Sequence, residues 1–217
     1  MKAQIFSAST LLSALLLFMA VACTGRHEQM QQQLALLQQH NQQDSVLTND
    51  SLAQALAEWF DDHGTPNEQV LAHYLLGRTH ADRGEAPAAI AAYHDAIDHA
   101  DTTAADCDYA LLCRVYAQMS DIFYRQSLME DYINSLDMSI HYAIISADSV
   151  VALNSFAYKM LAFERMNQPD SVIAICDSIY NDVYLKGKKK MASQFFGAAI
   201  SSYIKRHQLE KAKKSYF

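Results

Sequence analysis

The sequence contains few residues that form tight turns, since only 6 Gly and 3 Pro occur among its 217 residues. A β-sandwich or β-barrel of this length needs many such turns, so their scarcity argues against an all-β fold. Hydrophobic residues make up 51% of the chain, which is enough to build a core and excludes wholesale disorder. Ala, Leu, Gln, Asp and Ser are abundant, so long helices joined by short links fit the composition best.

Positive charge is also scarce, because 17 Lys and Arg face 24 Asp and Glu, for a formal net charge of −7. A nucleic-acid backbone is bound through clustered Lys and Arg, so the residues present argue against a nucleic-acid partner. The basic run Lys186-Gly187-Lys188-Lys189-Lys190 is interpreted as a solvated linker, with a phospholipid contact as the alternative.

The four cysteines do not indicate a disulfide framework or a zinc site. Cys107 and Cys113 are six residues apart on an expected helix, which separates them by roughly 9 Å along the axis and places them on different faces. The spacings also fail to match known zinc patterns. Cys107, Cys113 and Cys176 are therefore expected to be small buried hydrophobic residues, and Cys23 has a separate explanation.

Sequence signatures of catalysis are missing as well. The chain has no glycine-rich phosphate loop, no Gly-x-Ser-x-Gly and no His-Glu-x-x-His. His73 and His80 are two helical turns apart, about 10 Å, which is too far for one zinc ion, so both are expected to fill packing positions. His94 and His99 are expected to be solvated on different faces of the next helix. We therefore expect no enzyme, no metal ion and no cofactor.

Near the N-terminus, Lys2 supplies a positive charge and residues 5–22 are mostly apolar. The end of this run and the residue after it read Met19-Ala20-Val21-Ala22-Cys23. Small residues before a cysteine resemble the lipobox of bacterial lipoproteins. That resemblance implies a signal peptide over residues 1–22 and a diacylglycerol on Cys23. The alternatives are an ordinary secretory signal and, less well supported, a membrane span, for which the run is short of about 20 residues. Thr24 is not the Asp of inner-membrane retention, so the periplasmic side of the outer membrane is favoured.

A polar, Gln-rich stretch follows the predicted anchor. Residues 23–28 are expected to be a flexible tether, and a helix is expected to begin near Gln29. Residues 29–66 are interpreted as a degenerate helical hairpin that caps the following structure, with Asn49 or Asp50 as a helix cap and Trp59 as a core anchor. The turn-forming cluster at residues 61–66 ends this segment.

The best-formed unit of the sequence is Leu71–Asp101, which reads as two amphipathic helices joined at Arg83-Gly84-Glu85. Small residues occupy the positions where the two helices must touch, and a tyrosine lies between two of them: Gly77, Ala89, Tyr93 and Ala96. This order resembles the tetratricopeptide (TPR) repeat. The resemblance implies an all-α fold, an α-α superhelix of antiparallel hairpins in which each hairpin needs neighbours of its own kind.

Residues 67–217 are predicted to form a series of such hairpins. The unit just described lies at about 70–103, and similar hairpins follow at about 108–147, 150–184 and 189–217. The equivalent first-helix positions are Gly77, Ser120, Met160 and Ile200, which are 43, 40 and 40 residues apart. The standard repeat has 34 residues, so the resemblance is to the long, divergent arrays of bacterial lipoproteins and membrane-tethered sensors. Asp106 and Asp170 are predicted helix caps, and an ordinary α-bundle is the alternative fold.

In a TPR array the first helix of each hairpin lines the concave face, and this resemblance implies a peptide-binding groove. Mapped by register, the predicted groove residues are Tyr74, Arg78, Asp82, Ala117, Asp121, Tyr124, Arg125, Asn154, Ala157, Leu161, Arg165, Gln194, Gly197, Ser201 and Lys205. The recurring basic residues favour an extended peptide or a helix with acidic groups, or a C-terminal carboxylate. Alternatively, Arg78–Asp82 and Asp121–Arg125 are ordinary four-apart helix pairs.

These observations favour a non-enzymatic, lipid-anchored scaffold that binds a protein or peptide partner in the cell envelope. The last hairpin is incomplete, because residues 209–217 supply only the start of a second helix. The alternative is therefore the sensory part of a truncated membrane-tethered transcriptional regulator. A hydrolase or metal-binding module is a remote third hypothesis.

Overall fold

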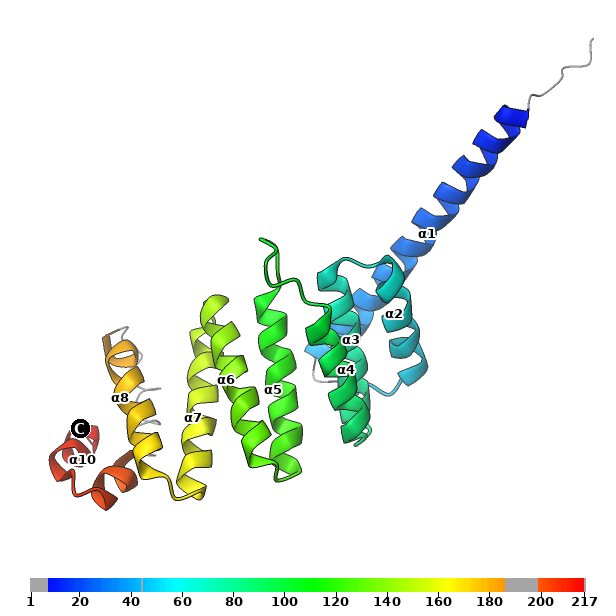
Figure 1. Cartoon of the computed structure of the whole chain (residues 1–217). Coiled ribbons are helices and arrows are strands. Elements are labelled where there is room, and N and C mark those ends of the chain that lie inside the picture. The colour runs from blue at the N-terminus through cyan, green and yellow to red at the C-terminus, as the bar shows by residue number, and fades with distance from the viewer. Residues whose placement is uncertain (1–7, 44, 186–198, 217) are drawn as a thin grey trace, which may run out of the picture. The chain divides into compact units, whose positions relative to one another are not determined.

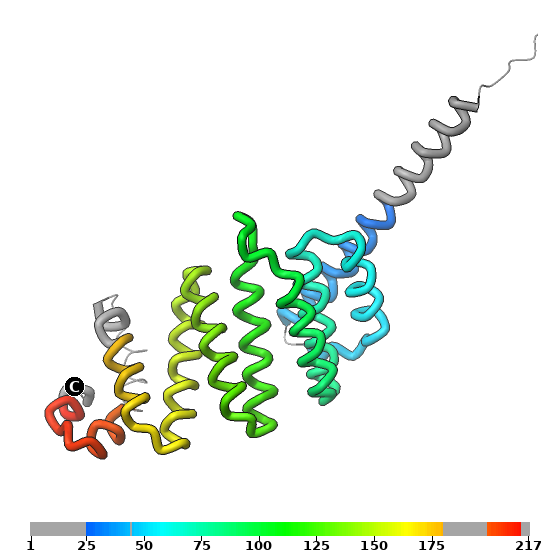
Figure 2. Tube along the Cα trace, in the orientation of Figure 1, coloured from blue at the N-terminus to red at the C-terminus, as the bar shows by residue number. Residues whose placement is uncertain are grey.

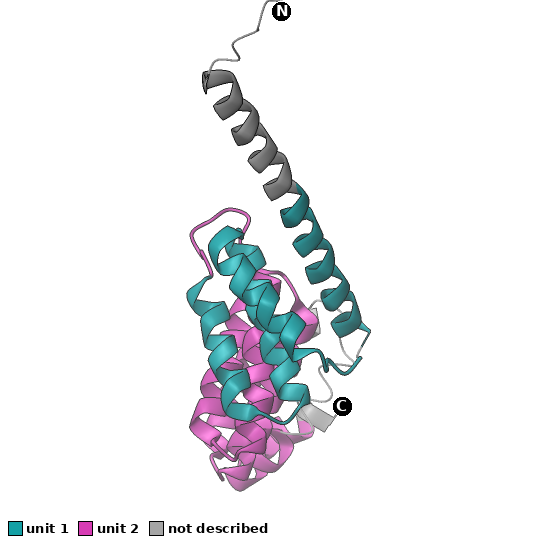
Figure 3. Ribbon diagram, turned by 90° about the vertical axis from the view of Figure 1, so that its right-hand side faces the viewer, with its two compact units in different colours: residues 1–99 teal, residues 100–217 magenta. Residues whose placement is uncertain are grey.

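The computed structural model describes residues 8–43, 45–185 and 199–216, with side chains for 25–43, 45–179 and 199–213. Throughout this part of the chain the regular structure is helical and no strand is found, which confirms the all-α prediction. The chain divides into two compact units, Met1–His99 and Ala100–Phe217 (Figure 3). Each unit is described by itself.

Unit 1 contains α1 (Ala8–Gln42), α2 (Asp50–His63), α3 (Pro66–Asp82) and α4 (Ala86–Asp98) (Figure 1). The helices α3 and α4 form the most extensively packed pair, and α2 packs on the other side of this hairpin against α3. The C-terminal part of α1 contacts both α2 and α3. Unit 1 is therefore one regular hairpin covered by two further helices.

The prediction of a flexible tether over residues 23–28 is wrong, because α1 continues as a helix through this segment to Gln42. Arg26 and Glu28 are good helix formers, and the single glycine of the stretch, Gly25, costs only about 1 kcal/mol relative to alanine. Arg26 adds an anchor, since its guanidinium lies 4.4 Å from the centroid of the Trp59 ring. The other face of that indole stacks on His63 at 3.9 Å between centroids. None of the helices in the described residues is long and apolar enough to cross a membrane.

Helix caps define the starts of α2 and α3, and the cap of α2 is one of the two residues that the sequence indicated. Asn49 is the N-cap of α2, and its side-chain oxygen accepts from the Leu52 N–H at 3.1 Å. Thr65 and Glu68 form a capping box at the start of α3, with Pro66 in the first turn. Because these residues satisfy N–H groups that have no partner within the helix, α3 can begin with only two residues between it and the end of α2 at His63.

The hairpin of α3 and α4 is packed through its small residues. Gly77 faces Tyr93, and a Cβ added at Gly77 would lie only 2.4 Å from the tyrosine ring. Ala89, Tyr93 and Ala96 are all fully buried. Gly84 closes the turn with a φ of 77°, a left-handed conformation that glycine adopts at little cost. The four residues that carried the TPR resemblance are therefore packing contacts.

Unit 2 contains α5 (Tyr109–Arg125), α6 (Met129–Ile145), α7 (Ser149–Arg165), α8 (Pro169–Leu185), helical residues 199–205 and α10 (Leu209–Tyr216). The trace in Figure 2 runs up and down through α5 to α8, and consecutive helices of this series pack side by side. Two cap predictions need correction. The N-cap of α5 is Asp108, not Asp106, and Asp170 lies within the first turn of α8.

One turn geometry recurs at the helix ends of unit 2. A residue with φ between 55° and 60° closely follows α5, α6, α7 and helical residues 199–205: Ser127, Ala147, Asn167 and His207. The next N–H then bonds back across the turn, as Leu128 N does to Phe123 O at 2.9 Å and Asp148 N to Ala143 O at 2.8 Å. This left-handed cap satisfies helix-end carbonyls. Because the first three lie 20 residues apart, the geometry explains the 40-residue spacing of the hairpins.

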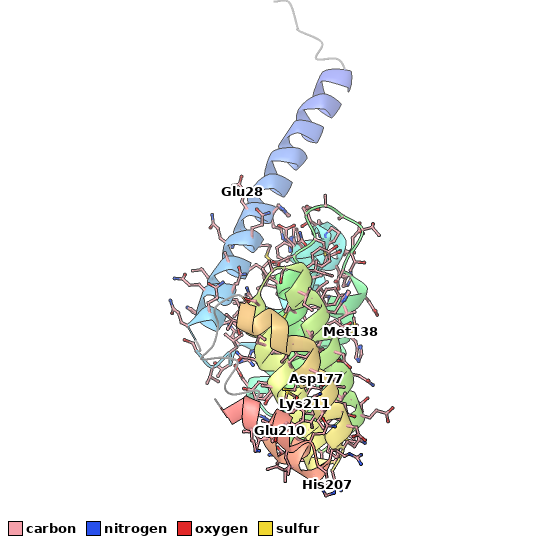
Figure 4. All side chains as sticks on the ribbon, turned by 90° about the vertical axis from the view of Figure 1, so that its left-hand side faces the viewer. Glu28, Met138, Asp177, His207, Glu210 and Lys211 are labelled. Carbon is pink, nitrogen blue, oxygen red and sulfur yellow. The ribbon has the colours of Figure 1, made fainter. Side chains whose placement is uncertain are left out.

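A buried cluster, an ion pair and a hydrogen bond stabilise the C-terminal part of unit 2. Met160, Val172 and Cys176 belong to one buried cluster that also includes Tyr203 and Ala212. In Figure 4 the labelled side chains of Asp177, on α8, and Lys211, on α10, point toward each other, and the Lys211 Nζ lies 2.7 Å from Asp177 Oδ2. Asp177 also accepts from the Tyr203 hydroxyl at 2.8 Å.

Candidate functional site

A pocket of about 580 Å³ opens in unit 2 between α5 and α7, with α6 at its base. Its lining consists of Ala117, Ser120, Asp121, Tyr124, Tyr132, Leu136, Val151, Asn154, Ser155, Tyr158, Leu161, Ala162 and Arg165. The α7 positions 154, 158, 161 and 165 follow the spacing of one helix face, and so do 117, 121 and 124 on α5. First helices of two successive hairpins therefore form its walls.

Aromatic rings and one guanidinium dominate one end of the pocket. Arg165 donates a hydrogen bond to the Tyr124 hydroxyl, and its guanidinium carbon lies 5.2 Å from the centroid of the same ring. The rings of Tyr124 and Tyr132 are 5.2 Å apart and inclined by 49°. Burial, with the neighbouring phenols, raises the pKa of Tyr132 to about 12, so this side chain stays a neutral phenol near neutral pH.

Large side chains around this pocket remain open to solvent. Tyr158 is 56% exposed, Leu161 47% and Tyr124 38%. Exposed apolar and aromatic groups that surround a hollow are typical of surfaces that bind another molecule, because covering them removes apolar area from water. Among the described residues of the lining, Asp121 supplies the carboxylate; it pairs with Arg125 at 2.8 Å, and both of these side chains are at least half exposed. The pocket thus combines apolar walls with separated charges.

The structure brings together part of the predicted groove. Asp121, Tyr124, Asn154 and Arg165 all line the pocket, together with Ala117 and Leu161. Arg125 and Lys205 do not line it. Arg125 extends into solvent beside Asp121, and Lys205 donates to Asn167 Oδ1 at 3.3 Å. Gln194 and Gly197 lie outside the described residues.

Tyr74 and Arg78, predicted for the same groove, lie in unit 1 against the chain's own N-terminal segment. Tyr74 is only 4% exposed, and Asn41 Nδ2 lies 3.4 Å from its hydroxyl. Arg78 donates to Asn41 Oδ1 at 3.2 Å and pairs with Asp82 at 3.0 Å. The other Asp82 oxygen accepts from the Leu47 N–H at 2.8 Å. We therefore correct the prediction for these two residues, because Asn41 and Leu47 contact this face of α3.

Register reasoning missed Tyr158, the most exposed aromatic residue of the pocket. It selected Ala157 instead, one position away and therefore about 100° around the helix. A usable signal was present, since Tyr158 follows Asn154 by four residues and precedes Arg165 by seven. Tyr132 and Leu136, on α6, form the base of the pocket, and the prediction from the first helices of the hairpins did not include them.

The cysteines in the described side chains are free thiols, as expected. Cys113 and Cys176 are buried, and Cys107 is half-buried. Burial raises the pKa of both Cys113 and Cys176, which keeps them protonated and poor nucleophiles. The Cys113 thiol donates to Ser139 O at 3.3 Å. These contacts give the thiols a packing role.

No protein-family model and no curated protein sequence matches the chain. Solved structures do match. TPR-like repeats of a Podosopora anserina protein described as a kinesin light chain superpose with a TM-score of 0.59 at 9% identity, over 87% of this chain and 92% of that one. A point variant of the same repeats gives 0.60 at 10% identity, over 87% and 91%. BtubC (BKLC) from P. vanneervenii gives 0.53 at 14% identity, over 86% and 70%. At these identities the likeness establishes the fold, a TPR-like helical repeat.

Proposed function

We propose that the protein is a scaffold that holds a segment of another protein in the pocket of unit 2 and is anchored to a membrane through a lipid on Cys23. Its TPR-like fold suggests a protein–protein interaction scaffold. Neither a catalytic activity nor a nucleic-acid partner is part of the proposal. The location that we favour is the periplasmic side of the outer membrane.

The observation that carries the proposal is the pocket between α5 and α7. Its exposed rings and Leu161 can cover an apolar side chain of a bound segment, while Arg165 can meet a carboxylate. A protein segment that presents an apolar or aromatic residue beside an acidic group, or beside its own C-terminal carboxylate, satisfies both features. We therefore propose an extended peptide or a helix of this composition as the ligand.

Leu161→Asp tests the pocket. The change places a charge among the apolar groups that a bound segment would cover, and we expect capture of the partner from a cell-envelope extract to fall at least about tenfold. Capture can be quantified by mass spectrometry against the unmodified chain. Undiminished capture by Leu161→Asp would move the binding surface away from this pocket.

Cys23→Ala tests the anchor. The lipobox resemblance makes Cys23 the acylated residue and the first residue of the mature chain, so this variant should lose incorporation of labelled palmitate completely. Cys107→Ala is the matched control, because Cys107 is a half-buried free thiol in unit 2 and should leave labelling unchanged. Equal labelling of the Cys23→Ala chain would refute the anchor without bearing on the pocket.

A further inference from the structure

Three side chains from three helices of unit 1 meet around one carboxylate oxygen. Asp61 lies near the end of α2, His73 lies within α3, and His99 is the C-cap residue of α4. Asp61 Oδ1 is 2.7 Å from His73 Nε2 and 3.1 Å from His99 Nε2. All three donor atoms lie within 4.8 Å of one another. These residues are separate from the pocket and from the predicted lipid anchor.

We propose that Asp61, His73 and His99 form a binding site for a divalent transition-metal ion of the zinc class. Two imidazole nitrogens and one carboxylate oxygen are the ligand types that zinc takes in proteins. Sequence spacing had directed attention to His73 and His80, but the structure pairs His80 with Glu85 at 2.7 Å. The expectation that His99 is simply solvated is therefore corrected, since it contacts Asp61.

The orientation of the two imidazoles fits a shared ion. Rings bound through Nε2 to one tetrahedral ion, with metal–nitrogen bonds of about 2.1 Å, have their centres about 5 Å apart. The ring centroids of His73 and His99 are 5.0 Å apart, and the ring planes are inclined by only 20°. Both Nε2 atoms already lie within 3.1 Å of the same oxygen, so the two histidines need little translation to ligate one ion.

Asp61 has room to complete the coordination. Donor atoms around a tetrahedral ion are about 3.4 Å apart, so the carboxylate must withdraw by less than about 1 Å. The side chain of Asp61 is 40% exposed and that of His99 is 32% exposed. Asp61 can therefore rotate outward, and water can reach the fourth position of the ion.

Ligation also sets the proton positions on the two imidazoles. Without an ion, His73 Nε2 carries a proton and donates to Asp61 Oδ1. Binding moves that proton to Nδ1, which leaves Nε2 free to ligate. The buried Nδ1 of His73 has no hydrogen-bond partner among the described residues, so the affinity should be about 10- to 100-fold weaker than in a site with a complete outer shell.

An ion at this position would connect α2, α3 and the end of α4. Because the unfolded chain does not hold the three ligands together, binding stabilises the folded unit by mass action. At a zinc concentration 100-fold above the Kd, the melting temperature of the full-length chain should rise by about 5 °C. The rise should continue with zinc concentration and be reversed by a chelator.

The experiment titrates the metal-free, full-length chain with Co²⁺, followed by its visible absorption, and with Zn²⁺, followed by calorimetry. We expect one ion per chain and a weakening of at least about tenfold in His99→Ala and Asp61→Asn. His94→Ala is the control, because His94 is an exposed histidine on the same helix, α4, and should leave binding unchanged. Circular dichroism of each variant confirms that the helices persist.

Two results would overturn the proposal. In the first, the chain takes up no ion under these conditions, which would leave Asp61 as a hydrogen-bond acceptor for His73 and a polar neighbour of His99. In the second, His99→Ala, Asp61→Asn and His94→Ala all bind the ion as the unmodified chain does, which would place the ion on other side chains.

Discussion

Gly77→Ala is expected to destabilise unit 1 by about 3 kcal/mol, because no space exists for the added methyl group. The new Cβ would lie 2.4 Å from Cε1 and 2.5 Å from Cδ1 of Tyr93. Those atoms belong to a fully buried ring, which has no solvent-facing side toward which it can move. Either α3 and α4 must separate or the ring must leave its rotamer, and both responses disturb the densest packing of the hairpin.

The free energy of unfolding, measured by urea denaturation of the full-length chain, checks this prediction. Gly25→Ala is the matched control, since its Cβ would meet no described atom within 4 Å and it also lies in a helix. That variant should be neutral or more stable by up to about 1 kcal/mol. In the double variant Gly77→Ala/Tyr93→Leu, removing the ring should reduce the penalty of the methyl group. If Gly77→Ala behaves like Gly25→Ala, the close packing of α3 on α4 is not as described.

Met160→Ala should destabilise unit 2 by about 3 kcal/mol, because it removes volume from a packed core and does not add any. Met160 occupies the register position of Gly77, is fully buried, and packs in one cluster with Val172, Cys176 and Ile179. Truncation would leave a cavity between α7 and α8, because the surrounding side chains can only partly close around the missing thioether. The loss therefore combines transfer energy with lost packing contacts.

Met166→Ala provides the comparison for Met160→Ala within the same hairpin. Met166 is the C-cap residue of α7 and is 42% exposed, so its truncation should change the free energy of unfolding by less than about 0.5 kcal/mol. Thermal or urea denaturation of both variants measures the difference. Equal stability of the two variants would contradict the register that aligns Met160 with Gly77.

These two positions show how the hairpins keep their packing volume while changing residues. In the first hairpin Gly77 receives the large Tyr93, whereas in the third the large Met160 packs in one cluster with the small Cys176. The sequence carried this information, because each small residue in one helix faces a large one at the matching position of the other. The TPR-like fold and its hairpins were therefore predictable, even where the small-residue signature is lost.

Other features of the fold were hidden for physical reasons. The left-handed turn residues Ser127 and Ala147 are not glycines, so the residue type gave no sign of the turn. The helix through residues 23–28 depends partly on Arg26 packing on Trp59, a contact between residues 33 positions apart. Tyr74 was assigned to a groove because a repeat pattern cannot reveal that Asn41, at the end of α1, contacts its hydroxyl.

The two candidate sites, the pocket and the histidine–aspartate cluster, also differ in how well the sequence predicts them. Repeat register located six pocket residues, since equivalent positions of successive first helices share a face. It could not locate the cluster of Asp61, His73 and His99, which comes from three different helices. Their positions in the sequence follow no metal-binding spacing, and only the packing of α2, α3 and α4 brings the three donor atoms together.

The central claim, that the pocket between α5 and α7 holds a protein partner, is tested most directly by site-specific photo-crosslinking. A photoreactive phenylalanine derivative replaces Tyr158 in the pocket or, as the control, Ile144 on α6, which is exposed and does not line the pocket. We predict a crosslinked partner from position 158 that Leu161→Asp abolishes, and no such product from position 144. The same product from both positions, or from position 144 alone, would contradict the claim.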